Sequence, residues 1–353
     1  MAQTKGLADK AMLVSLTISQ WVLIIMDKPA TKKFTVDNSV STGACTVRKR
    51  LLPKKGAVIE LQAAVSALRK YHGQMTLPWT KGIGILASSK YTEYSSKMRE
   101  LITAFKTAKS HLITEYPNLK DEAKLDLNTL WQDKEYPAAS DFDRRFDVSI
   151  DVMPIPQKGD WRIDLVDEEL EKLDDELEKR EGERIGKANQ ELWKRLYEPV
   201  KHMVEVLQKD KPRIFKTLIS NILDLTSILP DLNLAEDSKL EKLRREVEDE
   251  LCDLSVTELK ESPFLRDKIA EKAEELRKKI KEDGGIMDGD VVSGDVVSGD
   301  VNDDGVDDGV NDSAADDDIA EVMSGYTGSK YKDNEVIAEF GEPVVGQKKI
   351  KGV

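Results

Sequence analysis

The chain has few of the residues that build disulfide frameworks, metal centres and catalytic sites. Its 353 residues include two cysteines, Cys45 and Cys252, and three histidines. The cysteines lie far apart and neither has a second cysteine nearby, which excludes zinc-finger and thioredoxin-type motifs and indicates free thiols in a reducing cytoplasm. His72, His111 and His202 show no metal-ligand or catalytic spacing, so we expect structural or surface roles for them.

Motifs of nucleotide binding and of serine hydrolases are also missing. No serine lies in a Gly-x-Ser-x-Gly pattern, and the glycines of residues 81–84 lack the spacing of a phosphate-binding loop. The sequence therefore predicts a protein that is not an enzyme, with no catalytic residue and no cofactor.

Long hydrophobic runs are scarce. The apolar segment of residues 11–26 is shorter than the about 20 residues that a membrane-spanning helix needs. No cleavage site of a signal peptide follows it, because the next residues begin with Asp27. Val14, Leu16 and Ile18 alternate with polar residues, which predicts a buried strand leading into a turn. We expect a cytoplasmic protein that does not bind a membrane.

Charge is abundant but unevenly placed. Charged residues make up 34% of the chain, and the net charge is −13. Residues 284–330 hold 12 aspartates, one glutamate and one lysine, so the rest of the chain is close to neutral. This Asp/Gly/Val-rich stretch cannot bury enough apolar surface to offset its chain entropy, which predicts a disordered acidic tail after residue 283.

The first half of the chain shows both helical and strand periodicity. Apolar spacing predicts helices over residues 57–71, ended by Gly73, and over residues 91–116, stopped by Pro117, with a shorter helix over residues 119–131. Alternation predicts three strands, over residues 83–86, 146–152 and 161–165; the last two could form a hairpin.

The second half is charged and helical. A narrow leucine stripe over residues 166–177 is typical of a coiled-coil seam, and it returns over residues 192–207. Pro212 opens a more apolar helix that Pro230 ends. Two further amphipathic helices follow, which predicts an antiparallel bundle. The expected fold is mainly α with a small β component.

These patterns divide the chain into five regions. They are an N-terminal extension (1–11), a mixed α+β region (12–165), a charged helical bundle (166–283), a disordered linker (284–332) and a short C-terminal peptide (333–353). The last region is either a docking motif or an ordinary frayed terminus.

Three segments are candidate sites. Asp300, Asn302 and Asp304 resemble the start of a calcium loop, but the twelfth position lacks the bidentate glutamate, so we expect no specific metal site. The second segment is a predicted loop with Leu77, Pro78 and Trp79, which is either a contact surface or part of the core. The third is a basic segment that could contact single-stranded nucleic acid or be a solvated loop. It holds Arg48, Lys49, Arg50, Lys54 and Lys55.

Two runs carry a family resemblance. They are His72, Thr76-Leu77-Pro78-Trp79, Gly82 and Gly84-Ile85-Leu86, and then Phe146, Pro154-Ile155-Pro156 and Trp161-Arg162-Ile163-Asp164-Leu165. Through them the chain resembles, over residues 12–283, the phage and proteobacterial family called domain of unknown function 3150. Members of that family are often encoded beside MoxR-type AAA ATPases and von Willebrand factor A proteins. The resemblance implies a phage-encoded partner or adaptor of such an ATPase, in the host cell cytoplasm, and implies no catalytic residue.

The sequence thus leads to two hypotheses. The first is a non-enzymatic interaction or adaptor protein that binds a protein partner such as an AAA ATPase. The alternative is a single-stranded nucleic-acid-binding or recombination-associated protein that uses the basic segment near Arg48. Whether the chain forms a homo-oligomer stays open, because the leucine stripes can pack within one chain or between chains.

Overall fold

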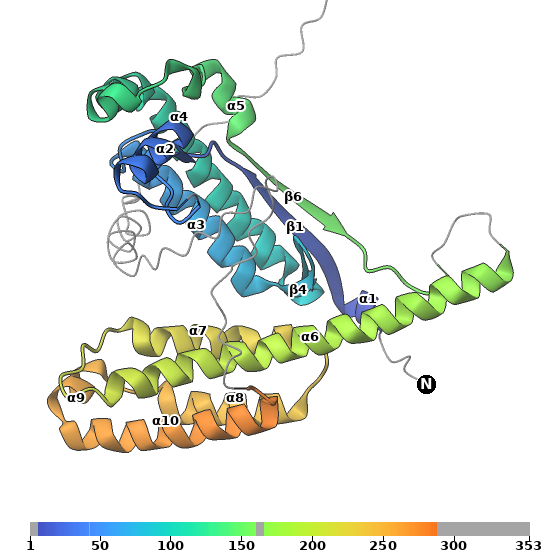
Figure 1. The fold of residues 1–353 in the computed structure, drawn as a ribbon. Helices are drawn as coiled ribbons and strands as arrows, with labels where there is room; N and C mark the ends of the chain where they lie inside the picture. The colour runs from blue at the N-terminus through green and yellow to red at the C-terminus, as the bar shows by residue number, and fades with distance from the viewer. Residues whose placement is uncertain (1–5, 42, 160–165, 288–353) are drawn as a thin grey trace, which may run out of the picture. The chain divides into compact units, whose positions relative to one another are not determined.

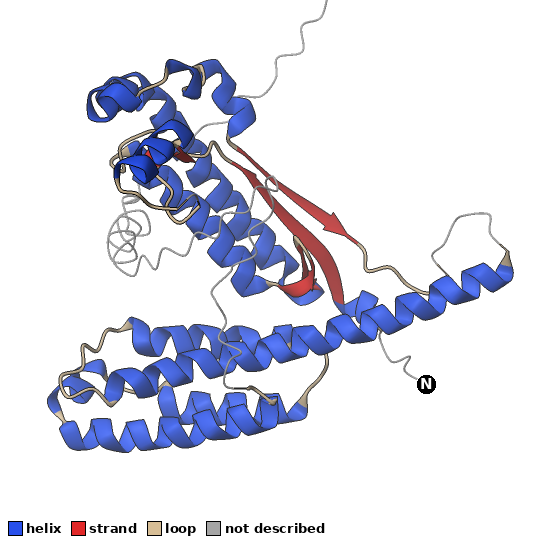
Figure 2. Cartoon of the chain, in the orientation of Figure 1, coloured by secondary structure: helices blue, strands red, loops and turns tan. Residues whose placement is uncertain are grey.

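The computed structural model describes residues 6–41, 43–159 and 166–287. This part of the chain is mainly helical with a small antiparallel sheet (Figure 2). The expected mainly α fold with a small β component is therefore confirmed. The predicted strand over residues 161–165, nearly all of the acidic linker, the C-terminal peptide and the calcium-like pattern at Asp300, Asn302 and Asp304 lie outside the described residues.

Four strands form the sheet, in the order β4-β5-β1-β6, and every neighbouring pair is antiparallel. The strands predicted within residues 11–26, 83–86 and 146–152 are confirmed as β1, β5 and β6. The bounds are β1 Ala11–Ser19, β4 Leu77–Thr80, β5 Ile83–Ala87 and β6 Asp147–Met153.

Strand β1 has a buried side chain on each of its two faces. Val14 and Ile18 belong to a core cluster with helices α3 (Ala57–Met75) and α4 (Tyr91–Leu127), which pack against each other. Leu13 points to the opposite face and belongs to a second core cluster with the helical bundle. This arrangement follows from the two-residue period of a strand.

Helix α3 continues past the glycine that was expected to end it. Met75 is 1% exposed and anchors the last turn in the core, while the Thr76 side chain donates a hydrogen bond to the His72 carbonyl (Oγ1–O 2.8 Å). Burial of the final turn therefore outweighs the low helix propensity of Gly73, which costs about 1 kcal/mol.

Helix α4 also corrects a predicted boundary, because Pro117 lies inside it. The two helices expected on either side of this proline form one helix of 37 residues. Proline removes one backbone hydrogen bond and costs about 3 kcal/mol in a helix interior. The buried side chains of Tyr116, Leu119 and Ala123 pack into the same core on both sides of the proline and offset that cost.

The helical bundle follows the sheet. Its long helices are α6 (Asp167–Leu207), α7 (Thr217–Leu232), α8 (Ser238–Leu251) and α10 (Pro263–Gly284), with the short α9 (Val256–Glu261) between the last two. In Figure 1 α7 and α10 lie beside the C-terminal half of α6, and α8 packs against α7 and α10. Two predicted boundaries were wrong, because α7 begins at Thr217 rather than Pro212 and continues through Pro230.

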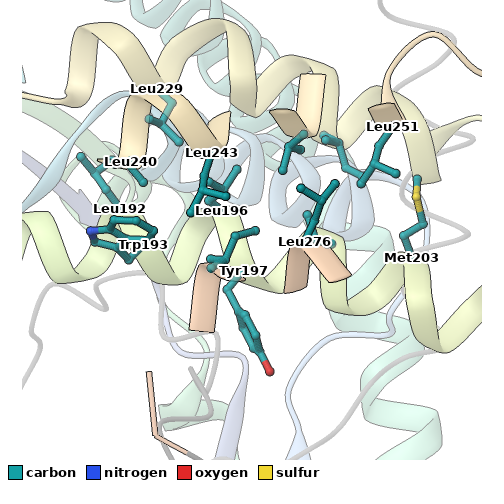
Figure 3. Close-up of a cluster of buried hydrophobic side chains, with 14 of the residues drawn as sticks. Leu192, Trp193, Leu196, Tyr197, Met203, Leu229, Leu240, Leu243, Leu251 and Leu276 are labelled. Carbon is teal, nitrogen blue, oxygen red and sulfur yellow. The ribbon is translucent and has the colours of Figure 1, made fainter. Parts of the chain in front are cut away.

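Leucines and aromatics from all four long helices fill the bundle core (Figure 3). Leu196, Leu240, Val247 and Ile280 are fully buried. Tyr197 reaches past the aliphatic side chains in Figure 3, and its hydroxyl accepts a hydrogen bond from Arg277 (Nη1–Oη 3.0 Å). The stripe predicted over residues 192–207 thus packs within one chain, whereas the stripe over residues 166–177 belongs to neither core cluster, and whether it pairs two chains stays open.

The remaining elements are short. They are α1 (Leu7–Lys10), β2 (Ile24–Met26), α2 (Lys28–Asp37), β3 (Arg48–Arg50), α5 (Phe142–Arg145) and single 3-10 turns at Ser88–Lys90, Asn128–Leu130, Asp133–Glu135 and Ala139–Asp141. Strands β2 and β3 pair with each other in a separate two-stranded sheet. Across the described ranges, no helix combines the length and the apolar character that crossing a membrane requires.

Candidate interaction surface

The segment proposed as a contact loop is mostly core. Leu77 and Trp79 lie on strand β4 and are 1% and 6% exposed, while Pro78 between them is exposed. The side chains of Leu77 and Trp79 pack in the cluster that includes Leu192 and Leu196 of α6. The contact-surface interpretation was therefore wrong for Leu77 and Trp79, because the bundle covers that face of the strand.

The structure also removes Lys49 from the predicted basic surface. Its side chain is buried, and its ammonium lies 3.0 Å from Asp27 Oδ2 and 2.9 Å from Glu135 Oε2. It also donates to the backbone carbonyl of Leu130 (2.7 Å). The ammonium thus lies buried among three oxygens of the protein, where a phosphate group cannot reach it.

Electrostatics hold this buried lysine in its charged form. Burial alone lowers the pKa of Lys49, but its hydrogen bonds and attraction to Glu135 and Asp27 outweigh burial, so the pKa is raised. The pKa of Asp27 is lowered by the backbone N–H of Ala30 (2.9 Å) and by Lys49. Lys49 therefore anchors β3 to the start of α2 and to the segment after α4.

The other basic residues stay closer to the surface. Arg48, Lys54 and Lys55 are exposed, and Arg50 is half-buried. Lys55 forms an ion pair with Glu122 on α4 (2.5 Å). The nucleic-acid contact predicted for these four residues stays a prediction.

Large apolar side chains are exposed in the same region. Five of the fourteen exposed large hydrophobic residues of the described chain lie within residues 22–36. They are Val22 (59% exposed), Ile24 (42%), Met26 (46%), Phe34 (44%) and Val36 (69%). We refer to the exposed side chains of residues 22–36 and of β3 as the β2–α2–β3 surface.

Strand pairing places cations beside two of these apolar groups. Ile24 lies opposite Arg50 in the β2–β3 register, and Met26 lies opposite Arg48. Side chains directly opposite each other in an antiparallel pair have Cβ atoms about 5 Å apart and share one face. The inner face carries Lys49, so the alternation of the two short strands separates a buried anchor from an exposed apolar and basic face.

Helix α2 adds a second exposed element. Its N-cap is Asp27, whose carboxylate accepts the Ala30 N–H, and proline stands in its first turn. Not one of its ten residues is buried. Hydrogen bonds between the Thr31 side chain and Val47 (2.9 Å from the Val47 N–H) connect it to the segment before β3. Isolated helices of this length are marginal in water, so α2 needs support from other segments, and within this chain it makes few contacts.

The residue pattern contained a signal for α2 that composition and periodicity missed. Asp27 followed by Lys28-Pro29 is the N-cap and first-turn proline of a helix start. Phe34 and Val36 do not repeat at helical spacing, so periodicity alone gives no helix there. The ion cluster of Asp27, Lys49 and Glu135 joins three separate segments and has no local signature.

The histidines and cysteines lie in separate environments. His72 is half-buried and hydrogen-bonded to Tyr94, His111 is exposed and paired with Glu60 (2.7 Å), and His202 is exposed. Cys45 and Cys252 are free and half-buried. Over the ranges that the structure describes, no group of three or more His, Cys, Asp or Glu residues is placed to hold a metal ion.

Comparison with known proteins gives no relative. No family model matches the chain, and neither a curated protein nor a solved structure shows significant similarity. The resemblance to domain of unknown function 3150 therefore stays a prediction.

Proposed function

We propose that this chain is a non-enzymatic interaction protein that binds a partner protein through the β2–α2–β3 surface. The observation that carries the proposal is the exposure of five large apolar side chains within residues 22–36. Large apolar groups exposed near one another and among polar residues are typical of protein interaction sites. A partner would also supply the packing that α2 lacks within this chain.

The charges around these apolar groups favour an acidic partner surface. Arg48 and Arg50 flank the apolar residues of β2, and Lys28, Lys32 and Lys33 of α2 are exposed. Complementary charge at the rim of an interface increases the association rate and excludes wrong partners. The family resemblance makes a MoxR-type AAA ATPase, or the von Willebrand factor A protein encoded with it, the first partner to test.

Binding of the purified ATPase and of the von Willebrand factor A protein, measured by biolayer interferometry, tests the proposal. We expect the wild-type chain to bind one of them and the double variant Phe34→Ser, Val36→Ser to bind at least tenfold more weakly. Both side chains are exposed on a helix without buried residues, so the variant should fold. The matched control is Leu125→Ser with Leu223→Ser, which removes two exposed apolar groups from α4 and α7.

Two results would contradict the proposal. One is equal binding by the double variant and the wild type, which would place the interface elsewhere. The other is the absence of binding to either protein together with a hydrolytic or transfer activity in the purified chain. Light scattering of the free chain shows whether the surface instead pairs two copies of the protein.

The nucleic-acid alternative keeps a separate test. Arg48, Lys54 and Lys55 are exposed beside Arg50, so a polyanion could still reach this segment without Lys49. A labelled single-stranded DNA that binds at low salt, with binding lost on Arg48→Glu with Arg50→Glu, would favour that function. No binding at low salt would reject it.

A further inference from the structure

An open cavity lies between the sheet region and the bundle, away from the β2–α2–β3 surface. Its volume is about 1050 Å³, and it is lined by the C-terminal half of α3, by β1, by the β4–β5 turn and by α6 and α7. The wall is fixed where α6 meets β4, because Arg195 donates a hydrogen bond to the Thr76 carbonyl (2.8 Å). Cavities of this size hold small organic ligands.

One part of the lining is apolar. Leu16 and Ile18 from β1 and Leu225 and Ile228 from α7 all line the cavity. These four side chains come from two elements distant in sequence and would contact an aliphatic or aromatic ligand body. Burying such a body yields about 25 cal/mol per Å² of apolar surface.

Most charges on the wall are already neutralised by neighbours. Lys90 pairs with Glu93 (3.0 Å) and Asp231 (3.4 Å), and Arg195 pairs with Glu191 (3.3 Å). Arg69 differs, because within the described ranges its guanidinium has neither a hydrogen bond nor an ion pair. Burial lowers the pKa of Arg69, and no carboxylate opposes that effect.

His72 stands one helical turn after Arg69 and lines the same cavity. The Tyr94 hydroxyl lies 2.8 Å from His72 Nδ1, and Tyr94 is 1% exposed. Burial lowers the pKa of His72 to about 4, so the ring is neutral at pH 7. In the tautomer in which the Tyr94 hydroxyl donates to Nδ1, the ring proton is on Nε2, and this nitrogen can donate a hydrogen bond to a ligand.

We propose that this cavity binds a small amphipathic organic anion, with its carboxylate or phosphate head on Arg69 and His72 and its apolar body between Leu16, Ile18, Leu225 and Ile228. An arginine presents a planar pair of donors that matches either head group. The inference is independent of the proposed docking function, since it uses none of the residues of the β2–α2–β3 surface.

Asp224 supplies the competing possibility. This exposed carboxylate also lines the cavity, and a cationic ligand would use it instead of Arg69. The charge of the preferred ligand therefore distinguishes the two arrangements. Octanoate, octyl phosphate and octylammonium share one apolar body and differ in the head group.

Titration calorimetry of the full chain with these three probes tests the proposal. Octanoate or octyl phosphate should bind at least tenfold more tightly than octylammonium, and the tighter of the two anions identifies the head group. Arg69→Gln should weaken that binding at least tenfold. The matched control Arg99→Gln, on exposed α4 surface, should leave it unchanged.

Equal or tighter binding of octylammonium would overturn the proposal, as would undiminished anion binding by Arg69→Gln or no binding of either anion. A melting curve for each variant shows whether it is folded. If Arg69→Gln does not fold, Leu225→Gln provides the second test. This variant should bind octanoate more weakly than the wild type and should not bind octylammonium.

Discussion

The indole nitrogen of Trp193 lies 3.0 Å from the Asp237 carboxylate, which joins helix α6 to the start of α8. The same carboxylate oxygen accepts a hydrogen bond from Asn189 (3.0 Å), and the other oxygen caps α8 through the N–H groups of Lys239 and Leu240. Burial raises the pKa of Asp237, but these hydrogen bonds together lower it. One side chain therefore both caps a helix and satisfies two polar groups of its neighbour.

Asp237→Ala should lower the free energy of unfolding by about 2–4 kcal/mol, because it removes the cap and leaves the Trp193 N–H without its acceptor. Urea unfolding followed by tryptophan fluorescence measures the change. The exposed Asp253→Ala is the control and should stay within about 0.5 kcal/mol of wild type. A small loss of unfolding free energy for Asp237→Ala would mean that water replaces the carboxylate as the hydrogen-bond acceptor.

Lys49→Met should destabilise the chain by about 3–5 kcal/mol, because it leaves the carboxylates of Asp27 and Glu135 without their counter-ion. The melting temperature and urea midpoint should both fall. Lys106→Met, on the exposed face of α4, changes the net charge equally and should have little effect. Equal stabilities of the two variants would contradict the assigned role of Lys49.

Acidification should destabilise the fold through His72. Its folded pKa is about 4, against 6.5 for an unperturbed histidine, so between these values the unfolded chain binds a proton that the folded chain excludes. The contribution of His72 to the free energy of unfolding is fully present above pH 6.5. It is lost as the pH falls toward 4, and the loss amounts to about 3 kcal/mol.

His72→Gln removes this titration. The difference between the wild-type and His72→Gln unfolding free energies, measured from pH 4 to pH 8, should slope upward with pH between 4 and 6.5 and be flat above. Other acid-titrating groups are common to both proteins and cancel. A flat difference throughout would show that His72 titrates normally.

Replacing each of two glycines by alanine should change the stability in opposite directions. A Cβ at Gly84 would lie 2.8 Å from the Thr76 side chain, which is buried, so Gly84→Ala should destabilise by about 1–3 kcal/mol. A Cβ at Gly186, inside α6, would meet nothing within 4 Å, so Gly186→Ala should stabilise by about 1 kcal/mol. Thermal melts of both variants check the signs. Equal shifts would mean that neither the space around Gly84 nor the helix at Gly186 is as described.

The sequence alone determined most elements and their class. Alternation in β1 and β6 and three-to-four spacing in α3, α4 and α10 are local patterns, set by which face of each element is buried. The amphipathic stripes likewise indicated a bundle. The apolar and basic composition of residues 22–36 and 48–50 was visible in the residues, although α2 was missed because its apolar side chains face away from any core.

Only the tertiary structure decided where the helices end and which side chains are exposed for contact with a partner or ligand. Pro117 and Pro230 lie inside helices because burial on both sides outweighs a lost hydrogen bond. Leu77 and Trp79 became core because α6, distant in sequence, covers β4. Lys49 became a buried anchor rather than a ligand contact because Asp27 and Glu135 converge on it from two other segments. Such outcomes depend on long-range contacts, and no local pattern contains them.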